Sequence, residues 1–206
     1  MPVLTGVDLL GIQGYVFGSN RLRDAIGASP LVHWATSPDG ALAGLTMTPP
    51  LLAAGGNALL EFPDLIAARR FATQYSRRLY DRARGLDAAV AHRTFEQGSL
   101  AAAVNALQKD LARVKTGYHP STPLLGLGIT AACRETGLAA HGFDAKDPSD
   151  PHAPLSRSIL AKRDSFREER ESGHWQRLLA LAPSFAGKAP RFPDDLDHLG
   201  RTAGEL

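Results

Sequence analysis

PVLTGVDLLGIQGYVF, residues 2–17, is the stretch of sequence that decides the fold of this chain. The stretch begins with mostly apolar residues, which predicts a strand before Gly11. Gly11 and Gly14 then favour a tight turn with a short helical segment behind it. The chain therefore opens with a strand that ends in a corner, and Asp8 lies near that corner.

A helix interrupted by a proline is predicted next. Its start is at Asn20 or Asp24, where a short polar side chain can cap the first turn. Ser29 followed by Pro30 has the composition of a second N-cap and a first-turn proline. We therefore expect a kinked or two-piece helix that restarts over residues 31–35.

The segment LLAAGGNALLEF, residues 51–62, predicts a hairpin. Gly55 and Gly56 supply the positive backbone dihedrals of a tight turn, and Asn57 follows them before the second apolar run. Asp64 can cap the next helix, whose apolar residues recur at spacings of three and four. LDAAVAHRTF, residues 86–95, then predicts a fourth strand.

The order strand, helix, hairpin, helix, strand predicts an α+β fold of the ferredoxin-like palm type, βαββαβ, with the helices on one face of the sheet. We assign residues 1–98 to this palm core and residues 99–143 to a helical and hairpin extension of it. Residues 144–206 are predicted to be a loop and C-terminal helices that lead into a missing second palm.

The extension has three predicted parts. A helix capped by Ser99 would bury Leu100, Val104, Leu107, Leu111 and Val114. A second hairpin would turn near Thr136 and Gly137, before a mobile loop over residues 144–154. The last helix is marked by the apolar residues Ile159, Phe166, Trp175 and Leu178.

Composition excludes several classes of protein. The single cysteine, Cys133, rules out an internal disulfide or a thiolate zinc knuckle, so we expect no zinc and a buried thiol in a strand. No apolar run reaches the roughly 20 residues of a membrane helix, and residue 1 starts no secretory signal. We expect a cytoplasmic protein with no membrane partner.

Basic residues gather on two predicted helices, although the net charge is only +2. One helix carries Arg69, Arg70, Arg77 and Arg78, and the other carries Arg157, Lys162, Arg163 and Arg167. Such faces can bind phosphates. Solvated outer faces of amphipathic helices are the interpretation we favour for both.

Asp8 and the Gly55-Gly56-Asn57 turn form the candidate site, because the first strand and the hairpin of a palm lie side by side. Two carboxylates at such tips can hold two Mg²⁺ or Mn²⁺ ions that orient a triphosphate. Gly11 and Gly14 add a corner where backbone N–H groups can approach phosphate oxygens. The alternatives, in which Asp8 caps the turn at Gly11 and Asn57 is only a turn residue, stay open.

Two segments resemble the palm domain in the large polymerase-cyclase subunit of type III CRISPR effector complexes. DLLGIQGYVFGSNRLRDAIGAS matches its acidic strand end, Gly-Ile-Gln, aromatic turn and Leu-Arg helix, and LLAAGGNALLEFPDLIAARRFA matches its Gly-Gly hairpin and following helix. The resemblance implies ATP binding, cyclic oligoadenylate synthesis in antiviral defence, and a nucleotide site near Asp8, Gly11, Gln13, Gly14, Gly55, Gly56 and Asn57.

The sequence departs from the active pattern of that family at the hairpin. Asn57 and Ala58 stand where the active palm has two aspartates, which leaves Asp8 as the one candidate metal ligand. The family's nuclease His-Asp pair and its zinc insertion are also missing. The chain therefore resembles the first, non-signature palm, and its end looks like a cut before a second one.

Three hypotheses follow. The first is a non-catalytic or regulatory palm, inactive alone, that supports an ATP site completed by a second palm in cis or in trans and reaches RNA through the effector complex. The second is a homodimeric metal-dependent nucleotidyl cyclase that uses Asp8 and Glu61, with Glu61 expected to point away from Asp8. The third is a ferredoxin-like RNA-binding module, for which the central strands lack clustered aromatic residues.

Overall fold

The computed structural model describes residues 1–96, 98–118 and 129–172 of the chain. Two compact units make up the molecule. The first, here the sheet unit, comprises Met1–Ile12 and Leu31–Ser121, and the second unit comprises Gln13–Pro30 and Thr122–Leu206. The domain limits expected from the sequence stay a prediction.

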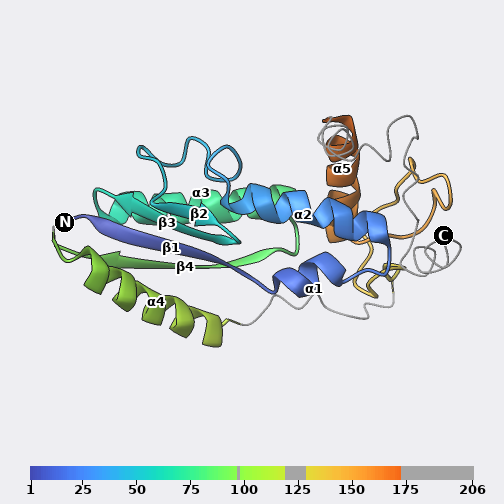
Figure 1. The fold of residues 1–206 in the computed structure, drawn as a ribbon. Coiled ribbons are helices and arrows are strands. Elements are labelled where there is room, and N and C mark those ends of the chain that lie inside the picture. The colour runs from blue at the N-terminus through green and yellow to red at the C-terminus, as the bar shows by residue number, and fades with distance from the viewer. Residues whose placement is uncertain (97, 119–128, 173–206) are drawn as a thin grey trace, which may run out of the picture. The chain divides into compact units, whose positions relative to one another are not determined.

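A four-stranded antiparallel sheet forms the centre of the sheet unit (Figure 1). Its strands are β1 (Val3–Leu10), β2 (Leu52–Ala54), β3 (Asn57–Phe62) and β4 (Asp87–Thr94). They lie in the order β2-β3-β1-β4, so the longest strands, β1 and β4, pair along their full length. The predicted α+β class, the hairpin and the fourth strand are confirmed.

One face of the sheet packs against α3 (Leu65–Arg82). This helix begins where predicted, because the carboxylate of Asp64 accepts a hydrogen bond of 2.8 Å from the backbone N–H of Ala67. Phe71 of α3 lies with its ring centroid 5.1 Å from that of Phe62 on β3. The buried hydroxyl of Tyr75 donates to the carbonyl of Ala35, which fixes the end of α2 (Leu22–Thr36) on the same face.

The opposite face of the sheet packs against α4 (Leu100–Thr116), as Figure 1 shows. A cluster of buried side chains joins the helix to β1 and β4; its members are Leu4, Ala89, Ala91, Phe95, Ala103, Leu107 and Leu111. The predicted inner face was partly wrong, because Leu100 and Val114 are exposed while Ala103 is buried. Ser99 also makes no side-chain cap, since its hydroxyl donates to the carbonyl of Glu96.

The segment between β1 and the β2–β3 hairpin differs from the prediction in two respects. Gly14 lies inside the short helix α1 (Ile12–Phe17), so only Gly11, with a φ of +59°, makes the corner. The next helix, α2, is one element with Pro30 inside it, and Ser29 does not restart it. A proline costs the helix one backbone hydrogen bond. Burial of the neighbouring Ala28 and Leu31 offsets that loss.

The second unit is built around α5 (Arg157–Glu171). The predicted turn at Thr136 and Gly137 is present, with Gly137 at a φ of +70°. The described part of the expected hairpin holds an isolated bridge between Ala132 and Ala139, and residues 119–128 lie outside the described residues. Cys133 is buried as expected, although not within a strand.

The expected mobile loop over residues 144–154 contains two buried aspartates, Asp144 and Asp147, so it is a packed segment. Trp175 and Leu178, expected in the last helix, lie outside the described residues. None of the helices in the described ranges combines the length and apolar content needed to cross a bilayer.

Candidate site at the end of strand β1

Strand pairing brings Asp8 and Asn57 together. Asp8 of β1 lies directly opposite Asn57 of β3 and, on its other side, opposite Ala89 of β4. Directly opposed residues of an antiparallel pair share a face, with Cβ atoms about 4.5–5.5 Å apart. The juxtaposition of strand end and hairpin turn expected from the sequence is therefore present in the sheet unit.

The turn itself requires its two glycines. Gly55 and Gly56 have φ values of +61° and +82°, a region that side chains rarely adopt. A Cβ on Gly56 would also lie 2.6 Å from Cδ1 of Ile12. The carbonyl of Gly56 accepts a 2.8 Å hydrogen bond from the backbone N–H of Leu9. This hydrogen bond joins the turn to the end of β1 at Leu9, one residue after Asp8.

Asn57 has its side chain partly committed to the turn. Its amide Nδ2 donates to the carbonyl of Gly55 at 3.3 Å, which is a typical role for an asparagine beside glycines. Ala58, the second position at which the active family pattern has an acid, is 3% exposed. Successive side chains of a strand alternate, so position 58 faces away from Asp8 and towards the α3 side of the sheet.

Helix α4 supplies the electrostatic partner of Asp8. The ammonium of Lys115, in the last turn of α4, forms an ion pair with the carboxylate of Asp8. The Asp8 side chain is 17% exposed and that of Lys115 is 41% exposed. The pair is therefore half-buried, and it places a fixed positive charge at the tip of β1.

The packing of α4 explains why Lys115 reaches this position. A Cβ on Gly6 would lie 2.8 Å from Cδ1 of Leu111, so the missing side chain allows the helix to lie close to β1. Asp8 follows Gly6 by two residues on the same strand face, and Lys115 follows Leu111 by one helical turn. Two residues of strand and four residues of helix both advance roughly 6 to 7 Å. Lys115 therefore lies beside Asp8 as Leu111 lies beside Gly6.

The tip of β1 does not fit a pair of divalent cations. Mg²⁺ requires several oxygen ligands, and two-metal sites use carboxylates held between the ions. Here Asp8 is opposed by a neutral amide and paired with an ammonium. Within the described ranges, no three His, Cys, Asp or Glu side chains gather where they could hold a metal ion.

Glu61 does not supply the missing acid, although our expectation about its direction was wrong. Glu61 pairs with Leu4, and it lies an even number of residues from Asn57, so its side chain is on the same face as that of Asp8. The four residues between the registers of Leu4 and Asp8 correspond to about 13 Å along the strand. Distance, not direction, therefore separates the two carboxylates.

The other sequence-predicted residues have different positions. Gly11 is exposed at the corner, and a Cβ added to it would meet no atom within 4 Å beyond its chain neighbours. Gln13 and Gly14 belong to the second unit, where Gly14 is exposed on α1. The site within the sheet unit thus comprises Asp8, the Gly55-Gly56-Asn57 turn and Lys115, of which Lys115 was not anticipated.

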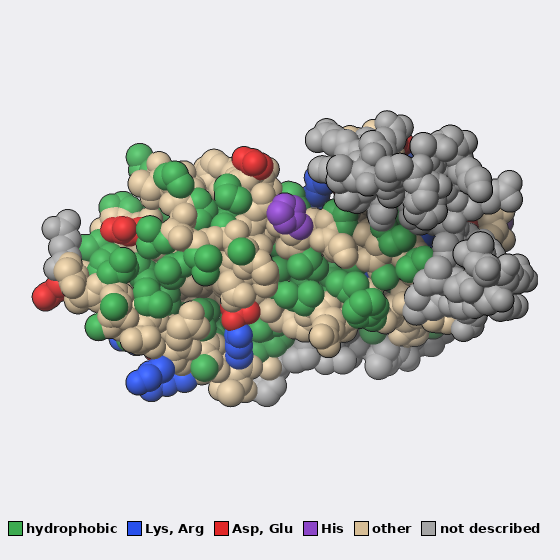
Figure 2. Space-filling view, in the orientation of Figure 1, with side chains coloured by type: hydrophobic (Ala, Val, Ile, Leu, Met, Phe, Trp, Pro, Cys, Tyr) green, Lys and Arg blue, Asp and Glu red, His purple; other side chains and the backbone are tan. Residues whose placement is uncertain are grey.

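Hydrophobic side chains dominate the visible surface of the sheet unit over β2 and β3, and acidic ones are scattered rather than gathered (Figure 2). Leu51 and Leu52 are each about half exposed there. Just past the C-terminal end of α4, three residues after Lys115, burial and then a hydrogen bond with Asp87 raise the pKa of Tyr118 to about 12. Tyr118 is therefore a neutral hydroxyl at physiological pH.

A buried ionic network in the second unit was not anticipated from the sequence. Its centre is Arg163, whose side chain is 2% exposed and lies 3.1 Å from Asp24 and 3.0 Å from Asp147. The guanidinium also approaches Glu135 at 3.4 Å and Asp144 at 3.7 Å. The basic face expected on α5 is thus turned inwards at Lys162 and Arg163.

The acids of this network include one that is strongly held in its ionised form. Burial alone would raise the pKa of Asp147, but hydrogen bonds from Arg23 and Ser149 hold it well below its usual range. The ammonium of Lys162 donates to the carbonyl of Tyr15, and burial lowers the pKa of that lysine. These groups link α2 and the loop around Asp147 to α5 within the second unit.

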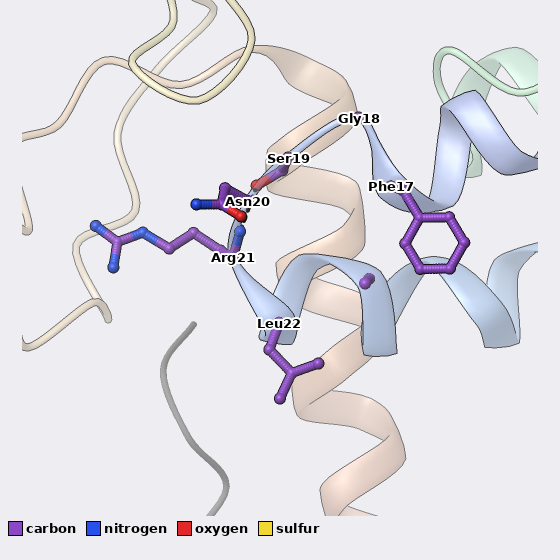
Figure 3. A pocket seen from close by; sticks show the side chains of 7 residues that line it. Phe17, Gly18, Ser19, Asn20, Arg21 and Leu22 are labelled. Atoms are coloured by element: carbon purple, nitrogen blue, oxygen red, sulfur yellow. Dashed lines mark hydrogen bonds between the residues drawn. The ribbon is translucent and has the colours of Figure 1, made fainter. Parts of the chain in front are cut away.

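A pocket of about 250 Å³ lies between α1 and α2 in the second unit (Figure 3). Its lining consists of Phe17, Gly18, Ser19, Asn20, Arg21, Leu22 and Ala25. The hydroxyl of Ser19 donates to Asp24 at 2.7 Å, and the guanidinium of Arg21 lies 3.5 Å from Glu135. The pocket contains none of the residues that the sequence pattern assigned to nucleotide binding.

No protein-family model matches the chain, and a search of curated proteins finds no match. Solved structures give distant and partial similarity to Csm1. The Csm1–Csm4 cassette in complex with one ATP is 20% identical over 56% of this chain and 18% of that chain, with a TM-score of 0.43. The apo cassette is 16% identical over 76% of this chain and 26% of that chain, with a TM-score of 0.47.

Csm1 from T. onnurineus is 18% identical over 76% of this chain and 25% of that chain, with a TM-score of 0.40. The chain therefore spans about a quarter or less of the length of these proteins.

Proposed function

We propose that this chain is a palm-type module without metal-dependent catalysis of its own, which supports an ATP site completed by a second palm in cis or in trans. The system would be one of antiviral signalling by cyclic oligonucleotides. The order β4-β1-β3-β2 with every neighbour antiparallel supports a ferredoxin-like palm, because β1 and β2 are then parallel strands joined through helices around β3.

The observation that carries the proposal is the pairing of Asp8 with Asn57. A palm that transfers nucleotides requires two metal-binding carboxylates at this meeting point, and here one of the two positions holds a neutral amide. The remaining carboxylate is neutralised by Lys115. ATP bound to this module would therefore need its Mg²⁺ or Mn²⁺ held by the partner palm.

We assign the nucleotide-facing role to the corner and the turn. Gly11 has no side chain and a positive φ, so its backbone can approach a phosphate closely. Gln13 and Gly14 would follow it on α1, and Gly55, Gly56 and Asn57 would face the partner. The proposal also permits two further partners. One is a Csm4-like subunit, since some Csm1 structures contain Csm4, and the other is RNA, reached through an effector complex.

The homodimeric cyclase is the weaker candidate. It would require Glu61 as the second acid, and Glu61 lies opposite Leu4, four register positions from Asp8. The RNA-binding alternative would require aromatic residues exposed on the sheet. The aromatic residue of the four described strands, Phe62, is buried against Phe71.

The experiment is nucleotide synthesis by the purified chain. We expect no cyclic or linear oligoadenylate after incubation with ATP and either Mg²⁺ or Mn²⁺, with products separated by chromatography and identified by mass spectrometry. Asp8→Ala serves as the matched control. Product formed by the unmodified chain and lost in Asp8→Ala would refute the proposal and favour an enzyme that is active by itself.

A further inference from the structure

We propose that Lys115 is a built-in cation that takes the place of a divalent metal on the Asp8 carboxylate, so that the tip of β1 is a metal-independent half of a nucleotide site. This inference rests on the proposed function, because it explains how a palm that lacks one acid keeps the other. The partner palm would then have to supply every metal ligand of the shared site.

The environment of Asp8 calls for a compensating charge. A carboxylate at the tip of a strand, with buried Ala89 on one side and Asn57 on the other, has lost part of its hydration. Such a group requires an opposite charge or hydrogen bonds. Lys115 provides that charge from within the chain, whereas a metal would provide it only when bound.

The position of the lysine on its helix suits this role. Ala103, Leu107 and Leu111 recur every four residues and are buried against the sheet. Lys115 is the next residue of that same row, where another apolar side chain would continue the core. A lysine can bury its methylene stem along this row while its ammonium reaches the acid.

The close approach of the helix at Gly6 sets the height of Lys115 above Asp8. A Cβ at position 6 would press on the end of the Leu111 side chain, one helical turn before Lys115, so the glycine lets this part of α4 lie close to β1. The ammonium is therefore held near the carboxylate by the packing of the helix. A second positive ion cannot share the carboxylate without displacing the ammonium, because like charges at this separation repel.

The test restores the missing acid with and without the lysine. Mn²⁺ binding is measured by electron paramagnetic resonance for Asn57→Asp, for Lys115→Met, for the double variant, and for the double variant with Asp8→Asn. Methionine keeps the length of the buried stem and removes the charge. Lys109→Met, at the other lysine of α4, is the matched control in the Asn57→Asp background.

We expect Asn57→Asp alone to bind Mn²⁺ at least about tenfold more weakly than Asn57→Asp with Lys115→Met, since one like charge is removed from the site. Adding Asp8→Asn should abolish the gain, and Lys109→Met should not reproduce it. Equal affinity of Asn57→Asp with and without Lys115→Met, or no binding in either, would overturn the inference.

A thermal-melting cycle of Asp8→Asn, Lys115→Met and their combination provides a second readout. If the two side chains are paired, the loss of melting temperature in the combination is smaller than the sum of the single losses. Additive losses would contradict the pairing. Neither readout involves ATP, so this inference can fail while the chain still makes no oligoadenylate, and oligoadenylate synthesis would refute the proposed function by itself.

Discussion

Replacing Arg163 by methionine is expected to destabilise the second unit severely. The side chain is 2% exposed, and its guanidinium lies within 3.1 Å of both Asp24 and Asp147. Removing one member of a buried ion pair typically costs about 3–5 kcal/mol, because the remaining charge stays buried without its partner. We expect the lower end, about 3 kcal/mol, since Asp147 keeps its ion pair with Arg23.

Asp24 is the acid that this change destabilises most, because it stays buried without its ion pair to Arg163. It is fully buried, and its other hydrogen bond comes from the hydroxyl of Ser19. Adding Asp24→Asn to Arg163→Met should therefore recover part of the lost stability, because a neutral amide costs less to bury than an unpaired carboxylate.

The assay is amide hydrogen exchange of α5 peptides, read by mass spectrometry, which reports the stability of this unit separately from that of the sheet unit. Arg170→Met is the matched control on the same helix, where the guanidinium carbon lies 5.7 Å from the centroid of the Phe166 ring. Such a contact contributes about 0.5–1 kcal/mol at an exposed site. Equal protection in Arg163→Met and Arg170→Met would refute the network as a source of stability.

Three further outcomes are expected. Gly6→Val should lower the free energy of unfolding by about 1–3 kcal/mol in urea titrations, because the valine overpacks the contact with Leu111. Gly14→Ala is the control: Gly14 has open space around it and a helical backbone, so this change should be neutral or stabilising by about 0.5–1 kcal/mol. Unchanged stability of Gly6→Val would contradict the tight contact between position 6 and the Leu111 side chain. Gly56→Ala should disorder the β2–β3 turn, because alanine is strained at a φ of +82° and its Cβ would clash with the side chain of Ile12. The readout is faster hydrogen exchange of the Leu9 amide, and an unchanged exchange rate would contradict the role of this glycine. The pKa of Asp147 is lower in the fold than in the unfolded chain, so its stabilisation is present above about pH 4 and lost as the pH falls below that value. Protection of α5 amides should follow that trend, and a decline on raising the pH instead would contradict the ion pairs.

The sheet and the turn were predictable because their signals are local. Three features each specify structure within a few residues: the mostly apolar residues before Gly11, the two glycines of the hairpin, and the aspartate before α3. The meeting of Asp8 and Asn57 followed from the order of these elements. Pro30 was misleading because burial of its neighbours overrides a local helix breaker.

The network around Arg163 could not be predicted in the same way. A basic residue on an amphipathic helix usually faces solvent, and the acids that surround this one come from distant parts of the chain. Asp24 precedes Arg163 by 139 residues. No spacing rule connects such positions, so burial of the charge emerges only when the unit is assembled.

Lys115 is an intermediate case, because the sequence did contain a signal for it. The row of Ala103, Leu107 and Leu111 points to position 115, and a lysine there interrupts an apolar stripe. The expected inner face was instead drawn through Leu100 and Val114, which are exposed. The expected face was right at Leu107 and Leu111 but ended at Val114 instead of Lys115, so the residue that completes the site was missed.

The most direct measurement of the central claim is a Mn²⁺ titration of the unmodified chain beside Asp8→Asn, followed by the electron paramagnetic resonance signal of free Mn²⁺. We predict that both proteins leave the free signal at the same level, because one neutralised carboxylate does not hold a divalent cation. A stoichiometric loss of free Mn²⁺ with the unmodified chain, restored by Asp8→Asn, would contradict this claim.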